Sequence, residues 1–510
     1  MVNRKGPHNK RIGCLCIFLA LILLLGMLAA CDSQTPDTPG SDSGKTTADG
    51  SKEADPSGTS DNNGTGENPN PSFDPESAPT PYMEDFNGYE FRVLSRNANN
   101  TYWAGKDICG DLNGNALDKA VYTRNEVVEK KYNFTIYEFQ SDDWVTTATT
   151  TGLAGGKDAY DMWAFKMNDI PSLAQEGYLW DLVELPGIRL EAAYYDQNLR
   201  ASSSFAKHEF FLTGDLVYMD ELATECIVFN PDIWKHFNLQ GTFKKDIYEI
   251  VDDGEWTIGM FTEMVKLTTF DRDGNGVMDR TDWWGFCWEN SNILGLNIGM
   301  GNELLTKNDD DIFILDVKEK QIGDLEKIIE LFNAGYSVGR DWTEDVFDMG
   351  NQFCTIRGIK YLADYTAQGL SFGVLPFFKA SEEQKNYCAF ISTYGSNAIN
   401  VTTTTEDPNK VASIIELLSY ESRKSVRPAL NNYLFGGRIL QHEDDVRMLE
   451  LVFANRKYEL CYLWSTGSLY TTMITLNDAQ ATGIASTIKS CEGAVEASVA
   501  RKLERLQNLA

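Results

Sequence analysis

The chain has 510 residues, of which 75 are acidic and 45 basic, so its formal net charge at pH 7 is −30. A surface this acidic repels phosphate backbones and anionic lipid headgroups, which argues against a nucleic-acid partner. The length exceeds what a single hydrophobic core usually supports, so we expect two domains or lobes.

The first 30 residues are typical of a signal peptide. They contain four basic residues and no acidic one, an apolar run at residues 17–25 that is too short to span a membrane, and Leu-Ala-Ala before Cys31. The stretch 28–31 resembles the lipobox of bacterial lipoproteins. This resemblance implies cleavage before Cys31, lipidation of that cysteine, for example with palmitate, and a position on the outer face of the cytoplasmic membrane of a bacterium, which we expect to be Gram-positive.

Residues 31–80 form a low-complexity segment. Seven of the 15 prolines lie here, and ten acidic residues stand against two basic ones. Such a composition cannot bury a core, so we predict a disordered tether between the lipid anchor and the folded body.

The folded body begins with alternating strand and helix patterns. We predict a strand at residues 89–94, a helix at 116–132, a strand at 134–139, then another helix and a strand at 159–165. This alternation predicts an α/β fold with a parallel, doubly wound sheet. Ligands bind such sheets at the carboxyl ends of their strands, so the loops after residues 94 and 165 are the first candidates for a site.

The later elements are mostly helical. A buried strand is expected at 226–229, and the expected helices cover residues 232–237, 257–267, 324–333, 408–420, 444–454 and 494–509. Thr257 and Asp407 are the predicted N-caps of two of these helices.

A twelve-residue acidic loop at positions 271–282 has the spacing of a calcium-binding loop. Gly276 stands at the sharp turn, and the expected oxygen ligands are Asp271, Asp273, Asn275, the Val277 carbonyl, Asp279 and Asp282. Hard oxygen donors suit Ca²⁺, and we predict weak binding with a structural role, because position 12 is Asp rather than Glu. The alternative is a metal-free turn held by Asp and Asn side chains.

No catalytic signature is present in the sequence. It contains no H-E-x-x-H, no G-x-S-x-G and no phosphate-binding G-x-x-x-x-G-K. Seven cysteines follow Cys31 without a C-x-x-C pair, and this odd number predicts at least one thiol that is free or pairs between chains. We therefore expect a protein that is not an enzyme, with no catalytic residues.

Short motifs across about 350 residues resemble the bacterial extracellular solute-binding proteins of family 1, the carbohydrate-associated lipoprotein receptors of ABC importers. The matching stretches, in chain order, are Tyr160-Asp161, Leu173-Ala174, Gly177-Tyr178-Leu179, Asp181-Leu182, Tyr194-Tyr195-Asp196-Gln197, Val228-Phe229-Asn230, Trp256-Thr257, the acidic loop before Gly285, Gly373-Val374-Leu375-Pro376 with Lys379, and Ser396-Asn397-Ala398-Ile399-Asn400.

The resemblance implies a two-lobed periplasmic-binding-protein-like fold (type II) that closes around a ligand by hinge motion. The first lobe would comprise residues 82–225 and 372–425, and the second 226–371 and 426–510, with hinges at 226–229 and near Phe372. The expected function is capture of a carbohydrate, an oligosaccharide by preference, for delivery to an ABC permease. A surface glycosidase or lyase, a glycan sensor or adhesin, and a receptor for a peptide or other solute remain alternatives.

Sugar recognition needs aromatic rings that stack on pyranose faces and polar side chains that bind hydroxyls. Each aromatic residue has core packing as its alternative role, and the Asp364-Tyr365 pair follows an apolar run that could end a strand. The candidates beside predicted cleft loops are Arg96, Asn97, Trp103, Trp163, Lys166, Asp215, Tyr218, Trp283, Trp284, Trp288, Asp364, Tyr365 and Trp464.

Overall fold

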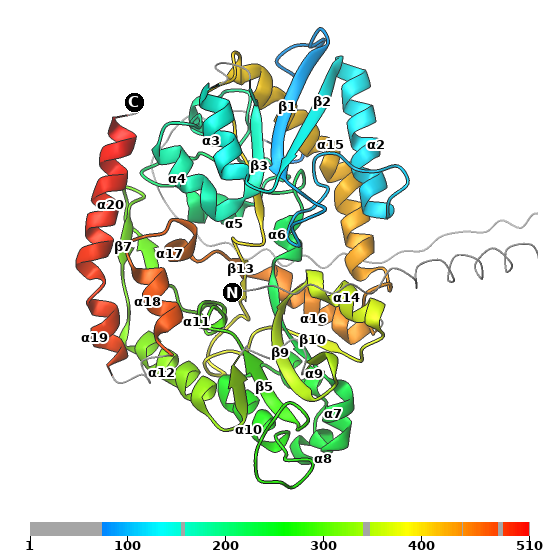
Figure 1. Cartoon of the computed structure of the whole chain (residues 1–510), viewed down its shortest axis with the longest axis vertical. Helices are drawn as coiled ribbons and strands as arrows, with labels where there is room; N and C mark the ends of the chain where they lie inside the picture. The colour runs from blue at the N-terminus through cyan, green and yellow to red at the C-terminus, as the bar shows by residue number, and fades with distance from the viewer. Residues whose placement is uncertain (1–73, 155–158, 340–346, 441, 478–482, 509–510) are drawn as a thin grey trace, which may run out of the picture. The chain divides into compact units, whose positions relative to one another are not determined.

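A four-stranded sheet contains the first predicted strands (Figure 1). The computed structural model describes residues 74–508, except 155–158, 340–346, 441 and 478–482. The strand order is β12-β3-β1-β2. β1 (Tyr89–Arg96), β2 (Phe134–Ser141) and β3 (Met162–Lys166) are parallel, and β12 (Asn397–Ile399) pairs antiparallel with β3 at the edge. The helices α2 (Ala116–Tyr132) and α3 (Trp144–Ala154) connect the parallel strands, which confirms the predicted α/β class.

Both faces of this sheet are covered by helices, as a doubly wound sheet requires. Val93 and Met162 pack with Ile414 of α15 (Pro408–Phe435), whereas Leu94 belongs to another buried cluster that includes Leu173 of α4 (Ile170–Gln175). Figure 1 shows α2 and α15 side by side, and the two helices contact each other extensively. The strands are therefore buried and unable to slide against their helices without losing apolar contacts.

A second, five-stranded sheet has the order β10-β4-β9-β5-β8. Its strands are β4 (Glu225–Phe229), β5 (Trp284–Trp288), β8 (Ser337–Gly339), β9 (Gln352–Gly358) and β10 (Gly373–Leu375). β5 is parallel to β8 and β9, while β4 is antiparallel to β9 and β10. The segment 372–425 thus begins in this sheet, at β10, and enters the first sheet at β12. The lobe and hinge boundaries themselves stay predictions.

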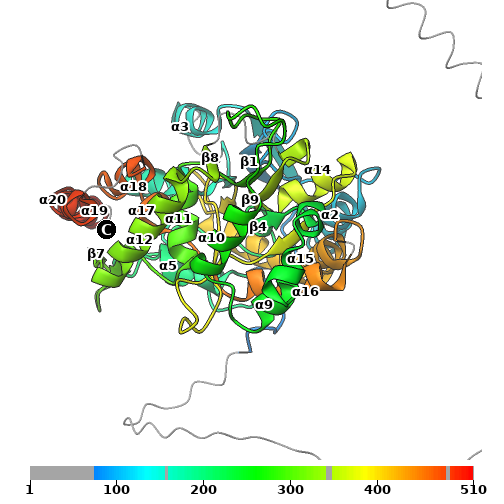
Figure 2. The same ribbon diagram turned by 90° about the horizontal axis from the view of Figure 1, so that it is seen from below.

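The remaining elements lie around the two sheets. Figure 2 shows α11 and α12 side by side, in agreement with their contacts. The short strands are β6 (Leu305–Lys307), β7 (Phe313–Leu315), β11 (Ala389–Phe390) and β13 (Arg456–Lys457). The other helices are η1 (Met167–Asp169), η2 (Leu182–Glu184), α5 (Gln197–Ser203), α6 (Met219–Leu222), α7 (Pro231–His236), α8 (Leu239–Phe243), α9 (Ile247–Asp252), α10 (Ile258–Leu267), α11 (Asn292–Gly299), α12 (Glu319–Asn333), α14 (Lys360–Gln368), α16 (Glu443–Ala454), α17 (Leu460–Leu463), α18 (Leu469–Thr475), α19 (Ile484–Lys489) and α20 (Glu492–Gln507).

Helix α15 is longer than predicted. Asp407 caps it as expected, but the helix runs for 28 residues, to Phe435, and contains Pro428. The sequence after Tyr420 is polar, so the second half of the helix was not predicted. In that half, Val426, Leu430 and Leu434 pack into another buried cluster. The helix therefore continues beyond the boundary of the first lobe predicted at residue 425.

The predicted tether differs from the structure at its end. Arg189 donates hydrogen bonds to the hydroxyl and carbonyl of Ser77, and Arg423 pairs with Glu76 at 2.6 Å. These cations hold residues 76 and 77 against the folded body, so the tether prediction is wrong for them. The predicted signal peptide, Cys31 and residues 31–73 lie outside the described residues.

Within the described residues, no helix is long and apolar enough to cross a membrane. The seven cysteines from Cys109 to Cys491 are all unpaired, and six of them are buried. They act here as small packing residues.

A buried ionic network joins β13 to α6, to the N-cap of α5 and to the second half of α15. Arg456 pairs with Asp196 at 3.0 Å and with Asp220 at 3.3 Å, and the side chains of both aspartates are at most 6% exposed. Arg427 pairs with Asp215 and Glu221 in the same region. Desolvation, and then the charge of Glu221, raises the pKa of Asp220 far above its ordinary value. The two arginines therefore offset part of the cost of burying these acidic side chains.

We predict that Arg456→Met lowers the free energy of unfolding by roughly 3–5 kcal/mol, because it leaves buried carboxylates without their cation. Arg447→Met is the matched control: its partners Asp252 and Asp444 are over 40% exposed, so the loss should stay below about 1 kcal/mol. Urea denaturation followed by circular dichroism measures both. Equal losses in the two variants would contradict the assigned role of the network.

Candidate ligand-binding cavity

A cavity of about 220 Å³ lies where the two sheets approach each other. The first sheet contributes Trp103, from the segment after β1, and Tyr394, from the segment before β12; the second contributes Glu225 of β4 and Arg357 of β9. Six aromatic side chains line it: Trp103, Tyr361, Phe390, Tyr394, Tyr462 and Tyr470. Its polar lining comprises Glu225, Glu289, Ser291, Arg357 and Ser392. Such a wall combines flat apolar surfaces with a few hydrogen-bonding groups.

Arg96 holds two walls of the cavity together. It is the last residue of β1, is 2% exposed, and donates hydrogen bonds to the carbonyl oxygens of Trp103 and Tyr394. Its guanidinium also lies 5.5 Å from the centre of the Trp144 ring. Desolvation lowers the pKa of Arg96 to about 10, against the opposing charge of Asp107. Arg96 therefore stays charged at neutral pH and positions the aromatic residues.

The Trp103 ring is packed against two glycines from different sheets. A Cβ at Gly358, the last residue of β9, would lie 2.7 Å from the ring, and one at Gly395, before β12, would lie 2.9 Å from it. Both distances are below van der Waals contact, so any side chain at either position would displace the ring. The absence of two Cβ atoms thus fixes Trp103 in the cavity wall.

The other aromatic residues form pairs around the cavity. The rings of Tyr462 and Tyr470 are stacked at 4.4 Å, and Tyr361 lies 5.8 Å from Trp103 in an edge-on arrangement. Tyr102, beside Trp103, donates a hydrogen bond of 2.6 Å to Asp364 of α14. This bond joins the loop after β1 to the helix that connects β9 and β10 of the second sheet.

Glu225 is the most perturbed acid of the cavity. Desolvation raises its pKa to about 8, the charge of Glu289 adds to this effect, and Arg357 opposes it. Its Oε2 atom is buried without a hydrogen-bond partner, while the Arg357 guanidinium bonds instead to the Tyr365 hydroxyl and the Ile356 carbonyl. An unpaired buried carboxyl oxygen is costly, so a protonated, neutral Glu225 is the favoured form at pH 7.

Three of the residues predicted to bind ligand gather at the cavity. Trp103 lines it, Arg96 supports it, and the Lys166 ammonium, paired with Asp169, lies 5.2 Å from the centre of the Tyr394 ring. These residues lie at or just after the carboxyl ends of β1 and β3, where a parallel sheet is expected to bind ligands.

The other predicted ligand residues have structural contacts elsewhere. Asn97 sits in the turn after β1, where its carbonyl accepts from Thr101. Asp215 forms ion pairs with arginines of α15. Asp364 and Tyr365 lie in helix α14, where we expected a strand end. Asp364 accepts a hydrogen bond from Tyr102, and the Tyr365 hydroxyl accepts one from Arg357. The aromatic residues at other positions pack in buried clusters or at their edges: Trp163, Tyr218, Trp283, Trp284, Trp288 and Trp464.

Sequence reasoning missed most of the aromatic lining. Trp464 was a predicted ligand residue, but its side chain is 1% exposed and packs against Phe205, while Tyr462 lines the cavity. Likewise Tyr361 precedes Tyr365 by one helical turn of α14, and Tyr361 is the one at the cavity. Recognising α14 as a helix would have provided the signal for Tyr361.

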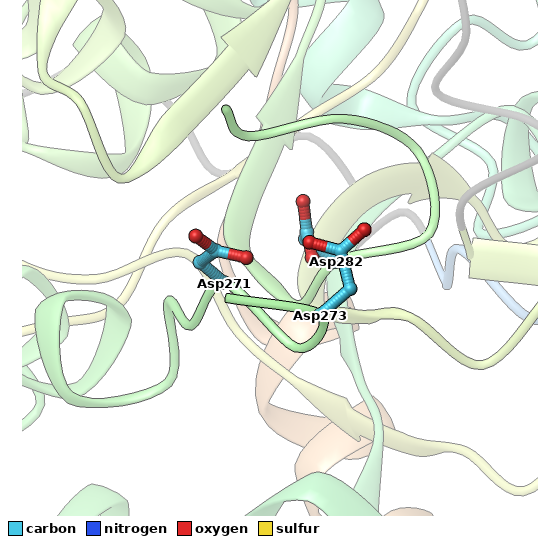
Figure 3. Close-up of side chains that lie close together, drawn as sticks. All are labelled: Asp271, Asp273 and Asp282. Atoms are coloured by element: carbon cyan, nitrogen blue, oxygen red, sulfur yellow. The ribbon is translucent and has the colours of Figure 1, made fainter. Parts of the chain in front are cut away.

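The acidic loop gathers three of its predicted calcium ligands. Carboxylate oxygens of Asp271, Asp273 and Asp282 lie within 4.8 Å of one another (Figure 3). Gly276 has the left-handed φ of +82° expected at the sharp turn, and Asp271 accepts from its amide. Backbone hydrogen bonds hold the pKa of Asp271 below its usual value. The donor set and the turn therefore fit Ca²⁺, although the amide hydrogen bonds alone also hold this conformation.

Comparisons by sequence gave no match among protein-family models or curated proteins. The fold, in contrast, matches solved structures. A cyclic alpha-maltosyl-1,6-maltose binding protein from Arthrobacter globiformis has a TM-score of 0.56 at 12% identity, over 81% of this chain and 99% of that one. An ABC substrate-binding protein from Listeria monocytogenes in complex with cycloalternan has a TM-score of 0.51 at 13% identity, over 81% and 99%. RafE from Streptococcus pneumoniae has a TM-score of 0.51 at 13% identity, over 82% of this chain and 100% of that one.

These similarities show that the chain has the two-lobed, periplasmic-binding-protein-like fold. The predicted fold class is thus confirmed.

We predict that Gly358→Ala destabilises the protein by about 1–3 kcal/mol, because its Cβ would collide with Trp103. In a Trp103→Ala background the same substitution should cost much less, since the colliding ring is gone. Gly323→Ala in α12, where a Cβ meets nothing within 4 Å, is the control and should be neutral or stabilising. Urea denaturation of the wild type and the three variants of this cycle, with the control, measures the coupling, and additive effects would contradict the packing of Trp103 on Gly358.

Proposed function

We propose that this chain is a solute receptor that binds a carbohydrate in the Trp103 cavity and delivers it to an ABC importer. The observation that carries the proposal is the lining of that cavity, which combines six aromatic rings with two acidic side chains and a guanidinium. Aromatic faces stack on the apolar C–H surface of a pyranose, and the polar groups form hydrogen bonds with its hydroxyls.

The placement of the cavity supports a mechanism of closure. Trp103 and Tyr394 belong to segments of the first sheet, and Glu225 and Arg357 to strands of the second, so a ligand that contacts all four stabilises the arrangement in which the sheets approach. The hydrogen bond from Tyr102 to Asp364 links the same two parts beside the cavity. A ligand shifts the population toward this state by its additional contacts there.

The fold supports the same proposal. Proteins of this fold include an ABC substrate-binding protein in complex with cycloalternan and a cyclic alpha-maltosyl-1,6-maltose binding protein. Lipidation of Cys31 would keep the receptor at the outer face of the cytoplasmic membrane, close to permease subunits, and the acidic tether would let it reach them. An oligosaccharide is the proposed cargo, and no covalent step is involved.

An enzyme is the second candidate, because Glu225 and Glu289 line one cavity and the pKa of Glu225 is raised to about 8. A glycosidase uses such a pair, one carboxyl as the acid and the other as the ionised partner. The two functions differ in turnover: a receptor returns the bound glycan unchanged, whereas an enzyme releases shorter products.

We expect saturable binding of a glycan with an increase in melting temperature and no products on chromatography. Trp103→Ala and Tyr462→Ala should each weaken binding by roughly ten-fold or more, since each removes a stacking surface. Tyr137→Ala, on the exposed side of β2, is the control and should leave affinity unchanged. Calorimetry measures these affinities; shortened glycans would favour the enzyme, and a full set of mono- and oligosaccharides without binding would contradict the proposal.

We also propose that the 271–282 loop binds Ca²⁺ in a structural role, with a Kd on the order of 10⁻⁴–10⁻³ M. Added Ca²⁺ should raise the melting temperature, a chelator should reverse the change, and Asp273→Asn should weaken the effect because it removes a converging carboxylate. Asp309→Asn, outside this cluster, is the control. A melting temperature that is insensitive to calcium would show that the amide hydrogen bonds alone hold the loop.

A further inference from the structure

We infer that the cavity prefers a glycan that carries a protonated amine, with its ammonium group bound at the Glu225 carboxyl. The inference rests on the proposed function and narrows its substrate class.

The first support is the place of Glu225 in the cavity. It stands at the start of β4, and its Oε2 is buried without a hydrogen-bond partner. Helix α11 meets this oxygen at Gly295, where a Cβ would lie 3.3 Å away, so the glycine offers it no polar side chain. Glu225 lines the cavity, and its carboxyl has hydrogen-bonding capacity that the protein leaves unused.

The second support is the balance of charge around Glu225. The charged groups that act on it are Glu289, from the segment after β5, and Arg357, from β9. The described residues contain no ion pair between Glu225 and Arg357, whose Nε and Nη1 atoms donate to Tyr365 and Ile356. A second acid and a guanidinium engaged elsewhere leave Glu225 without a cation of its own.

The third support is the aromatic wall. The titratable tyrosines of the lining are Tyr361, Tyr394, Tyr462 and Tyr470, from α14, the segment before β12, α17 and α18. Ring faces attract cations through their quadrupoles, and a carboxyl beside such rings completes a site for an ammonium group. The net charge of −30 favours a cationic ligand further, by raising its concentration near the surface.

The protonation state of Glu225 gives this preference a signature. With a pKa of about 8, the free carboxyl is mostly neutral at pH 6, where amino sugars are protonated. A bound ammonium favours the ionised carboxylate and lowers its pKa, so binding at pH 6 releases a proton from Glu225. A neutral sugar hydroxyl provides no such charge and leaves the proton in place.

The test compares three ligands of one ring geometry: a glucosamine oligosaccharide, its N-acetylated form and the corresponding glucose oligosaccharide. We use the full chain in mild detergent, at pH 6 and moderate salt, in two calorimetry buffers with different enthalpies of ionisation. We expect the amine to bind about ten-fold or more tightly than either neutral ligand, with net release of up to one proton. Glu225→Gln should abolish both the preference and the proton release; Glu326→Gln, on the exposed face of α12, should change neither.

Several results would overturn the inference. Equal or tighter binding of the neutral oligosaccharides would refute it and leave the proposed function standing. An amine preference that persists in Glu225→Gln would assign the effect to the acidic surface instead. Failure of all three ligands, together with the wider sugar set, would reject both the inference and the proposed function.

Discussion

The arrangement of the candidate site depends on one buried guanidinium. Arg96 ends β1 and binds the carbonyl oxygens of Trp103 and Tyr394, which lie almost 300 residues apart in the chain. This connection ties the loop after a central strand to the segment that enters the edge strand β12. The buried Arg96 cation has lost its water shell, so it depends on these carbonyls and on the Trp144 ring for its interactions. These contacts fix Arg96, and through it they fix the position of the aromatic wall.

The second sheet completes the cavity both with lining side chains and with a glycine that leaves space for a ring. Gly358 leaves room for the Trp103 ring, while Arg357, next to it on β9, lines the cavity. Glu225 approaches from β4, the neighbouring strand. The proposed ligand position adjoins strands of one sheet and loops of the other, which is the geometry expected where binding is coupled to closure.

The sequence predicted the first sheet well because its signals are local. The bounds of α2 were correct, and the first three strands were found, since alternation and helical spacing are visible in short windows. The site was harder. Trp103, Arg96 and Lys166 follow from the rule on strand ends, whereas Tyr361, Tyr462 and Glu225 reach the cavity through tertiary packing between distant segments. Nothing in the sequence separates Tyr462 from the buried Trp464, because a difference of two helical positions decides which one faces the core.

Hydrogen–deuterium exchange with and without a saturating glycan tests the central claim most directly, because it reports both sheets at once. The account predicts slower exchange in the segments around Trp103, Glu225, Arg357, Tyr394 and Tyr462, which come from both sides of the cavity. The outer strand β2 and helix α20 should not change. Protection confined to one sheet, or located away from these segments, would contradict a ligand that binds between the sheets and stabilises their approach.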